Sequence, residues 1–144
     1  MMPSPTFMTT ARARSTVTFE APDTTVWRFE GDVSESIMRE LTHQEKRMID
    51  GHPYLLKLVD MRHAGKIDPG ARKAGAEKVH DVPVLAVAIF GANFAISVLA
   101  NLVIRAGCIL RKIDTVPTRF FDTEAEGRDW LEKRRIEIQS NLVE

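Results

Sequence analysis

Few residues of this 144-residue chain could support catalysis or bind a metal. They are one cysteine, Cys108, and four histidines at positions His43, His52, His63 and His80. No two histidines stand at i and i+4, the spacing that presents two zinc ligands on one helix face, and no C-x-x-C motif is present. We therefore expect no metal site and no cofactor.

A general acid–base pair is the main catalytic hypothesis that the sequence offers. Asp60 ends an apolar segment, and His63 follows it in a segment that reads as a loop. Functional sites form at the ends of parallel strands, so Asp60 and His63 could act together. A solvated loop histidine explains the same residues, and no G-x-S-x-G, P-loop or G-x-G-x-x-G motif is present. We expect a protein that is not an enzyme.

Composition narrows the class of protein and of partner. Lys plus Arg and Asp plus Glu each number 20, so the chain has no general attraction for nucleic acid. A single cysteine excludes an intramolecular disulfide and fits the cytoplasm, where we expect the protein to act. Residues 1–14 are rich in Pro, Ser and Thr and predict a disordered leader. We expect residues 15–140 to form a single domain.

An uncharged run, residues 82–104, has the length of a membrane span. Pro83 and Gly91 interrupt it, and its first part is rich in β-branched residues. Only eleven uncharged residues follow Asn93, fewer than the roughly 20 of a spanning helix. The run therefore predicts a buried strand at 82–91 and a helix at 93–112, with no membrane span.

The remaining elements follow from periodicity and punctuation. Strands are predicted at 15–21, 24–30, 54–61 and 118–121, a loop at 62–67, and helices at 33–50, 68–80 and from 123 onward. Asp32, Asp68-Pro69 and a capping box from Thr123 to Glu126 mark helix starts. The order β-β-α-β-α-β-α-β-α predicts an α/β fold, a mixed five-stranded sheet with one antiparallel edge and four packed helices.

Helical periodicity also predicts which side chains face the sheet. In the last helix these are Trp130, Leu131 and Ile136. In the helix at 93–112 a polar stripe runs through Asn93, Ser97, Asn101 and Arg105, and the opposite face should pack on the sheet through Ala95, Leu99, Leu102, Val103, Ala106 and Leu110.

Three apolar residues, Phe94, Val98 and Ile104, fall within or beside that polar stripe. Neighbouring helices could cover them. Alternatively they contact a second subunit or an apolar ligand.

The segment LLKLVDMRHAGKIDPGARK resembles the signature of STAS domains, in which an apolar strand ends in Asp and a later Asp opens a helix. The closing elements Arg119-Phe120-Phe121, Glu124-Ala125 and Trp130-Leu131 resemble the SpoIIAA-like branch, also described as STAS/SEC14-like. The resemblance covers residues 15–136 and implies the SpoIIAA-like fold.

The sequence departs from that family at its regulatory position. The phosphorylated Ser of anti-sigma factor antagonists corresponds to Gly70 here, and the Ser before it to Pro69. Neither residue accepts a phosphate.

We therefore expect a non-enzymatic STAS-like protein-interaction module that forms a homodimer and is not switched by phosphorylation at this position. The alternative is a SEC14-like carrier or sensor of an apolar small molecule, and the third hypothesis is an enzyme that uses Asp60 and His63. The sequence does not indicate which protein would be the partner.

Overall fold

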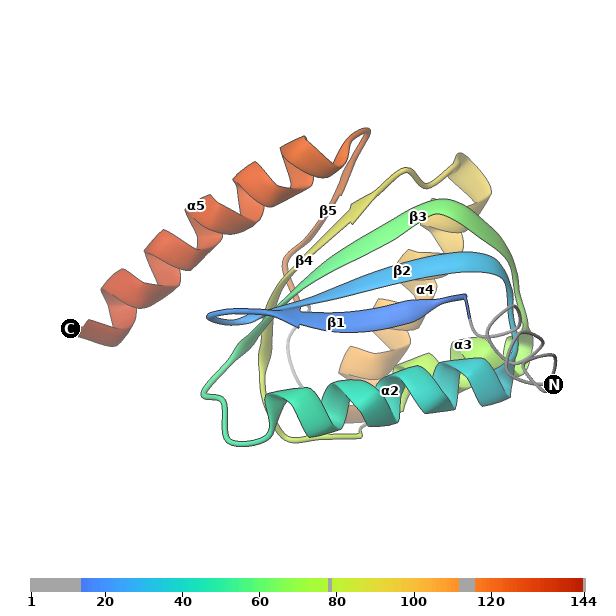
Figure 1. Ribbon diagram of the computed structural model, residues 1–144, viewed down its shortest axis with the longest axis horizontal. Helices are drawn as coiled ribbons and strands as arrows, with labels where there is room; N and C mark the ends of the chain where they lie inside the picture. The colour runs from blue at the N-terminus through green and yellow to red at the C-terminus, as the bar shows by residue number, and fades with distance from the viewer. Residues whose placement is uncertain (1–13, 78, 112–115, 144) are drawn as a thin grey trace, which may run out of the picture.

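The computed structural model describes residues 14–77, 79–111 and 116–143 and confirms the predicted α/β architecture (Figure 1). The predicted leader, residues 1–14, lies outside the described residues except for Arg14. In chain order the elements are β1 (Thr16–Glu20), β2 (Thr24–Val33), α2 (Glu35–Ile49), β3 (Leu55–Ile67), α3 (Pro69–Ala76), β4 (Val84–Phe90), α4 (Phe94–Arg111), β5 (Thr118–Phe121) and α5 (Glu124–Val143).

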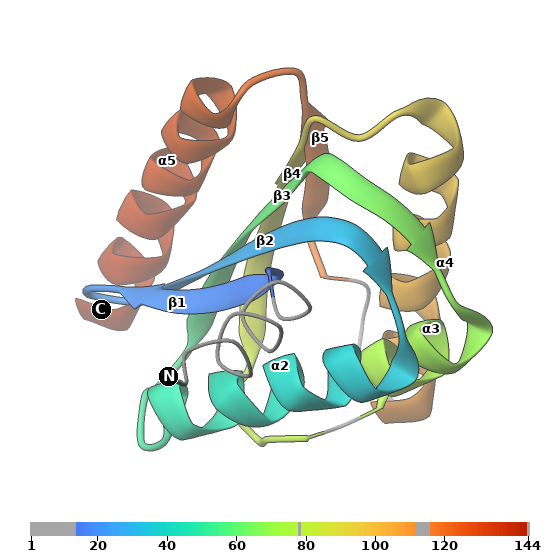
Figure 2. The same cartoon turned by 45° about the vertical axis from the view of Figure 1, so that its right-hand side comes forward.

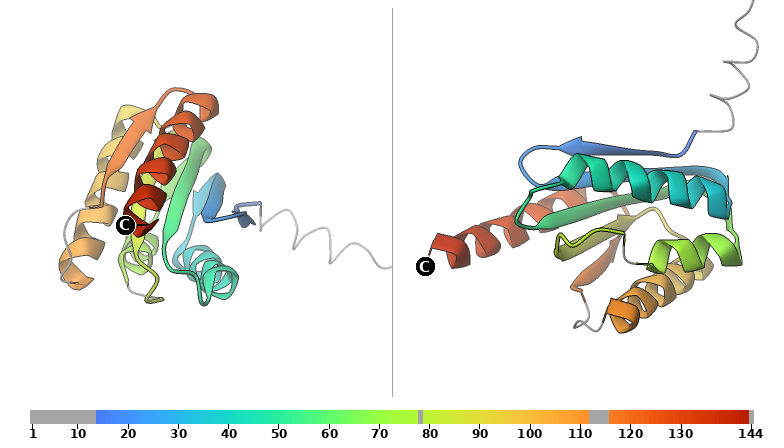
Figure 3. Two further views of the ribbon diagram at one scale, coloured as in Figure 1. Left: turned by 90° about the vertical axis from the view of Figure 1, so that its left-hand side faces the viewer. Right: turned by 90° about the horizontal axis from the view of Figure 1, so that it is seen from below.

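The five strands form one sheet in the order β1-β2-β3-β4-β5. β1 pairs antiparallel with β2, and the other neighbours are parallel. Alternate side chains of β4 serve two cores: Val87 and Ile89 face the side of α2, α3 and α4, whereas Ala88 and Phe90 face α5. Figure 3 shows α3 and α4 lying side by side.

The uncharged run divides as predicted into a strand, β4, and a helix, α4. Gly91 separates them with a φ of 73° to 82°, the range shared by three glycines here, and its own value is 75°. A Cβ at this position would lie 2.3 Å from Arg62 Cγ, so glycine is required. Within the described part of the chain, no helix carries an apolar stretch long enough to cross a membrane.

The prediction of a loop at 62–67 is wrong, because β3 continues to Ile67. This extension pairs with the end of β2, His63 opposite Glu30 and Ile67 opposite Val33, through two register irregularities. The long β2–β3 pair curves beyond β4 (Figure 2). Asp32 is consequently part of β2, and Ser34 caps α2 instead, accepting the Ile37 N–H at 3.3 Å.

The two remaining helix starts were predicted correctly. Pro69 is the first residue of α3, which ends at Ala76, earlier than expected. Thr123 and Glu126 form the capping box of α5, each accepting the other's backbone N–H at 3.2 Å. The inward orientation of Ile136 is wrong, since it is 56% exposed. Ile138, two turns beyond Leu131, is buried in its place.

Candidate functional site

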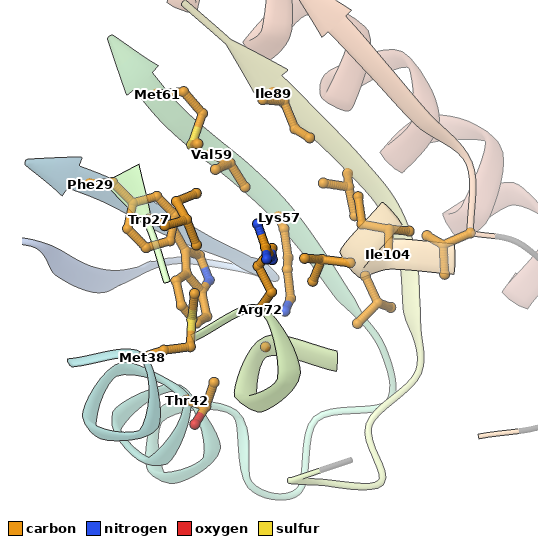
Figure 4. A pocket seen from close by; sticks show the side chains of 16 residues that line it. Trp27, Phe29, Met38, Thr42, Lys57, Val59, Met61, Arg72, Ile89 and Ile104 are labelled. Carbon is orange, nitrogen blue, oxygen red and sulfur yellow. The ribbon is translucent and has the colours of Figure 1, made fainter. Parts of the chain in front are cut away.

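A cavity of about 160 Å³ lies between the sheet and the three helices α2, α3 and α4 (Figure 4). Its walls are mostly apolar and come from both layers, including Trp27, Phe29, Met38, Met61, Ile89 and Ile104. The polar groups that line it are few: Thr42, Lys57 and Arg72. An enclosed apolar space with a small number of polar groups is typical of a small-molecule site.

The cavity exists because α4 makes its main contacts with α3 rather than with the strands. Val103 and Ile104 point inward and line the cavity. The prediction that Leu102 and Ala106 pack on the sheet is wrong, because both are exposed, Leu102 by 56%. Helical periodicity predicted the apolar face but not the neighbour against which the helix packs.

The three residues predicted as interface or ligand contacts are placed differently. Ile104 is half-buried against the core and lines the cavity. Val98 is 43% exposed and lies on the outer face of α4. The side chain of Phe94 lies outside the described part of the structure, as does that of Cys108. The outer stripe is completed by Leu102 and by Ile109, which is 74% exposed.

One edge of the cavity is built around a buried carboxylate, Glu45 of α2, which is 2% exposed. Its Oε2 accepts hydrogen bonds from Thr25 Oγ1 at 2.8 Å and Trp27 Nε1 at 2.9 Å. Its Oε1 lies 3.2 Å from Lys57 Nζ and 3.4 Å from His80 Nε2. His80 Nδ1 accepts the Val82 N–H at 3.2 Å, so Nε2 carries the proton that faces Glu45.

The neighbours of Glu45 keep it charged. Burial alone would raise the pKa of this carboxyl, but the Lys57 ammonium and the surrounding donors outweigh burial and lower the pKa to about 2. The same carboxylate holds Lys57, whose Nζ also lies 5.0 Å from the centroid of the Trp27 ring. Glu45 therefore fixes two residues that line the cavity.

Asp60 and His63, the predicted acid–base pair, have separate surroundings. Asp60 is 3% exposed and accepts hydrogen bonds at 2.8 Å from both Arg28 Nη1 and Arg62 Nη2. Burial would raise the pKa of Asp60, but hydrogen bonds from Arg62 and Arg28 lower it to about 2. His63 is exposed on β3. A carboxylate held in this way is a structural anchor, and Arg28 extends it to Glu124 of α5 at 3.2 Å.

Gly70, the position of the family's phosphorylated Ser, is the second residue of α3 and packs against α2. A Cβ there would lie 2.6 Å from Glu35 Oε1 and 3.0 Å from Glu35 Cβ. A side chain at this position would thus meet both a close contact and a negative charge.

The other histidines do not assemble into a site. His52 lies against Phe19 with ring centroids 5.0 Å apart, and His43 is exposed. Over the described residues, no three His, Cys, Asp or Glu side chains come together as a metal ion would require.

Sequence reasoning missed Glu45, Lys57 and Arg72, although the first two carry a signal. Glu45 falls on the apolar face of its helix with Met38, Leu41 and Ile49, where a charge requires a buried partner. Lys57 is the one charged residue within the apolar segment LLKLV. Arg72 gave no signal, because its role depends on where α3 lies.

We predict that Glu45→Gln lowers the free energy of unfolding by about 3 kcal/mol at neutral pH, because it leaves the Lys57 ammonium partly buried without its counter-charge. Glu40→Gln, on the exposed face of the same helix, is the control and should change stability by less than about 0.5 kcal/mol. Urea unfolding measures both, and equal small losses would contradict the assigned role of Glu45.

The difference between wild type and Glu45→Gln should also depend on pH. The folded-state pKa of Glu45 is lowered from 4.5 to about 2, so the stabilisation is complete above pH 4.5 and is lost as the pH falls toward 2. The two unfolding free energies should therefore converge over this range. A constant difference down to pH 2 would show that the charge of Glu45 is not what stabilises the fold.

Comparison with known proteins supports the fold. No protein-family model matches the sequence, and no curated protein matches it. A solved structure does: an uncharacterised DUF3478-family protein with a SpoIIAA-like fold from Shewanella loihica PV-4, determined at 2.25 Å resolution, aligns with a TM-score of 0.57. The two sequences are 17% identical, and the match covers 81% of this chain and 91% of that chain. The chain therefore has the SpoIIAA-like fold that its sequence predicted.

Proposed function

We propose that this protein is a non-enzymatic binding module that holds an apolar small molecule between α4 and the sheet, as a carrier or sensor. The observation that carries the proposal is the apolar cavity of about 160 Å³. It favours the SEC14-like alternative from the sequence over the protein-interaction module. Ile104, one of the three residues in question, lines this cavity.

The energetics of the cavity favour an occupant. An unfilled apolar space costs about 24 cal/mol per Å³ in lost packing. At 160 Å³ this amounts to about 4 kcal/mol, a large fraction of the stability of a domain of this size. An apolar ligand would recover part of that loss, so binding and stability should increase together.

Two observations favour binding over catalysis or a phosphorylation switch. Asp60, the candidate general base, is fully engaged by arginines and has a pKa of about 2. Gly70 lacks a hydroxyl and lies against Glu35, where a phosphate would meet like charge.

The test uses 1-octanol as a neutral apolar probe, titrated by calorimetry into the full-length protein. Wild type should bind it, and Val103→Phe should weaken binding at least tenfold because the ring occupies the cavity. Leu102→Phe introduces the same ring on the exposed face of the same helix and should bind like wild type. No binding by wild type, or equal loss in both variants, would exclude the cavity as the binding site.

Self-association is the second candidate function, and it has its own observation. Val98, Leu102 and Ile109 recur on one outer face of α4 and are 43%, 56% and 74% exposed. A contiguous apolar stripe on a helix commonly marks an interface. A second copy of the chain could bury this stripe without involving the cavity, so the two functions are compatible.

Sedimentation velocity over a range of concentrations tests this candidate. Wild type should form a dimer, and Leu102→Asp should shift it to monomer by placing a charge within the stripe. Arg105→Asp, which changes a polar residue on the exposed side of the same helix, serves as a charge control. A wild type that remains monomeric at the highest concentration would refute self-association through α4.

A further inference from the structure

The charge of the cavity indicates what kind of ligand it accepts. Two cationic side chains line it, Lys57 from β3 and Arg72 from α3, and its described lining contains no acidic residue. The Lys57 ammonium is already balanced by Glu45 Oε1 at 3.2 Å. The remaining positive charge of the cavity is therefore that of Arg72.

Arg72 is half-buried, and its side chain extends from α3 into the cavity (Figure 4). Among the residues that the structure describes, no carboxylate forms an ion pair with its guanidinium. Asp68, one turn earlier, accepts only the backbone N–H of Arg72, through its carbonyl at 2.9 Å. A guanidinium that has lost part of its hydration without gaining a partner favours binding of an anion.

We propose that the cavity binds a small amphiphilic carboxylate, with its apolar part among the apolar walls and its carboxylate on the Arg72 guanidinium. This inference rests on the proposed function, because it requires that the cavity takes a ligand. The planar fork of a guanidinium matches the two oxygens of a carboxylate. A single unbalanced cation suits a monoanion better than a phosphate monoester, which carries close to two negative charges at neutral pH.

The volume of the cavity limits the size of the apolar part. An engineered cavity of about 150 Å³ holds benzene, and the cavity here is about 160 Å³. A single aromatic ring or a chain of about six to eight carbons would fill it. Octanoate is therefore a suitable probe, and 1-octanol and octylammonium match its chain with a neutral and a positive head group.

Calorimetric titration of the full-length protein with these three probes tests the inference. Wild type should bind octanoate about 10- to 100-fold more tightly than 1-octanol, the range expected for a charge-assisted hydrogen bond. Octylammonium should bind most weakly. Arg72→Met keeps the length of the side chain and removes its charge, so it should bind octanoate no better than 1-octanol while still binding 1-octanol.

Lys73→Met is the matched control, because it removes the same charge from the next residue of α3, which is exposed. It should retain the preference for octanoate. Arg72→Lys keeps the charge without the fork and should retain part of it. If Arg72→Met does not fold, Arg72→Lys and the three-probe comparison on wild type still decide the question.

The failures of the two proposals are distinguishable. Equal affinity of wild type for octanoate and 1-octanol, or a preference that survives Arg72→Met, would overturn the carboxylate site and leave the apolar cavity intact. Failure of wild type to bind any of the three probes would overturn the proposed function, and the carboxylate site with it.

Discussion

The arrangement of the cavity depends on one buried carboxylate, Glu45 of α2. It joins its helix to β2 through Thr25 and Trp27, and to β3 through Lys57. A buried charge without such partners would cost several kcal/mol, so the fold is constrained to bring these elements together. The same contacts hold Lys57 in an internal ion pair and leave Arg72 as the cation without an internal counter-charge. A structural interaction thereby sets the charge of the binding site.

The two faces of the sheet are held by different forces. On one face α5 is fixed by ion pairs at both ends, through Glu124 with Arg28 and through Arg135 with the buried Asp23. On the other face α4 packs chiefly on α3 and stands off the strands. Space for a ligand is therefore found under α4 and not under α5. The exposed apolar stripe of α4 faces away from this space, which separates a ligand site from a subunit interface.

Local signals in the sequence were sufficient for most of the fold. The strand–helix division of the uncharged run, Pro69 at a helix start and the capping box at Thr123 were all predicted, because each depends on nearby residues. The end of β3 was not, since the polar segment 62–67 is ordered by pairing with β2. The site was less accessible still. Glu45 and Lys57 stand out as charges in apolar patterns, but their pairing and the direction of Arg72 depend on tertiary packing.

Methyl NMR of the full-length protein titrated with octanoate would test the central claim, that the ligand lies inside the cavity, most directly. Val103 and Ile104 line the cavity, whereas Val98, Leu102 and Ile109 lie on the outer face of the same helix. The account predicts that resonances of the inner methyl groups shift and those of the outer ones do not. Shifts confined to the outer stripe, or none at all, would contradict it.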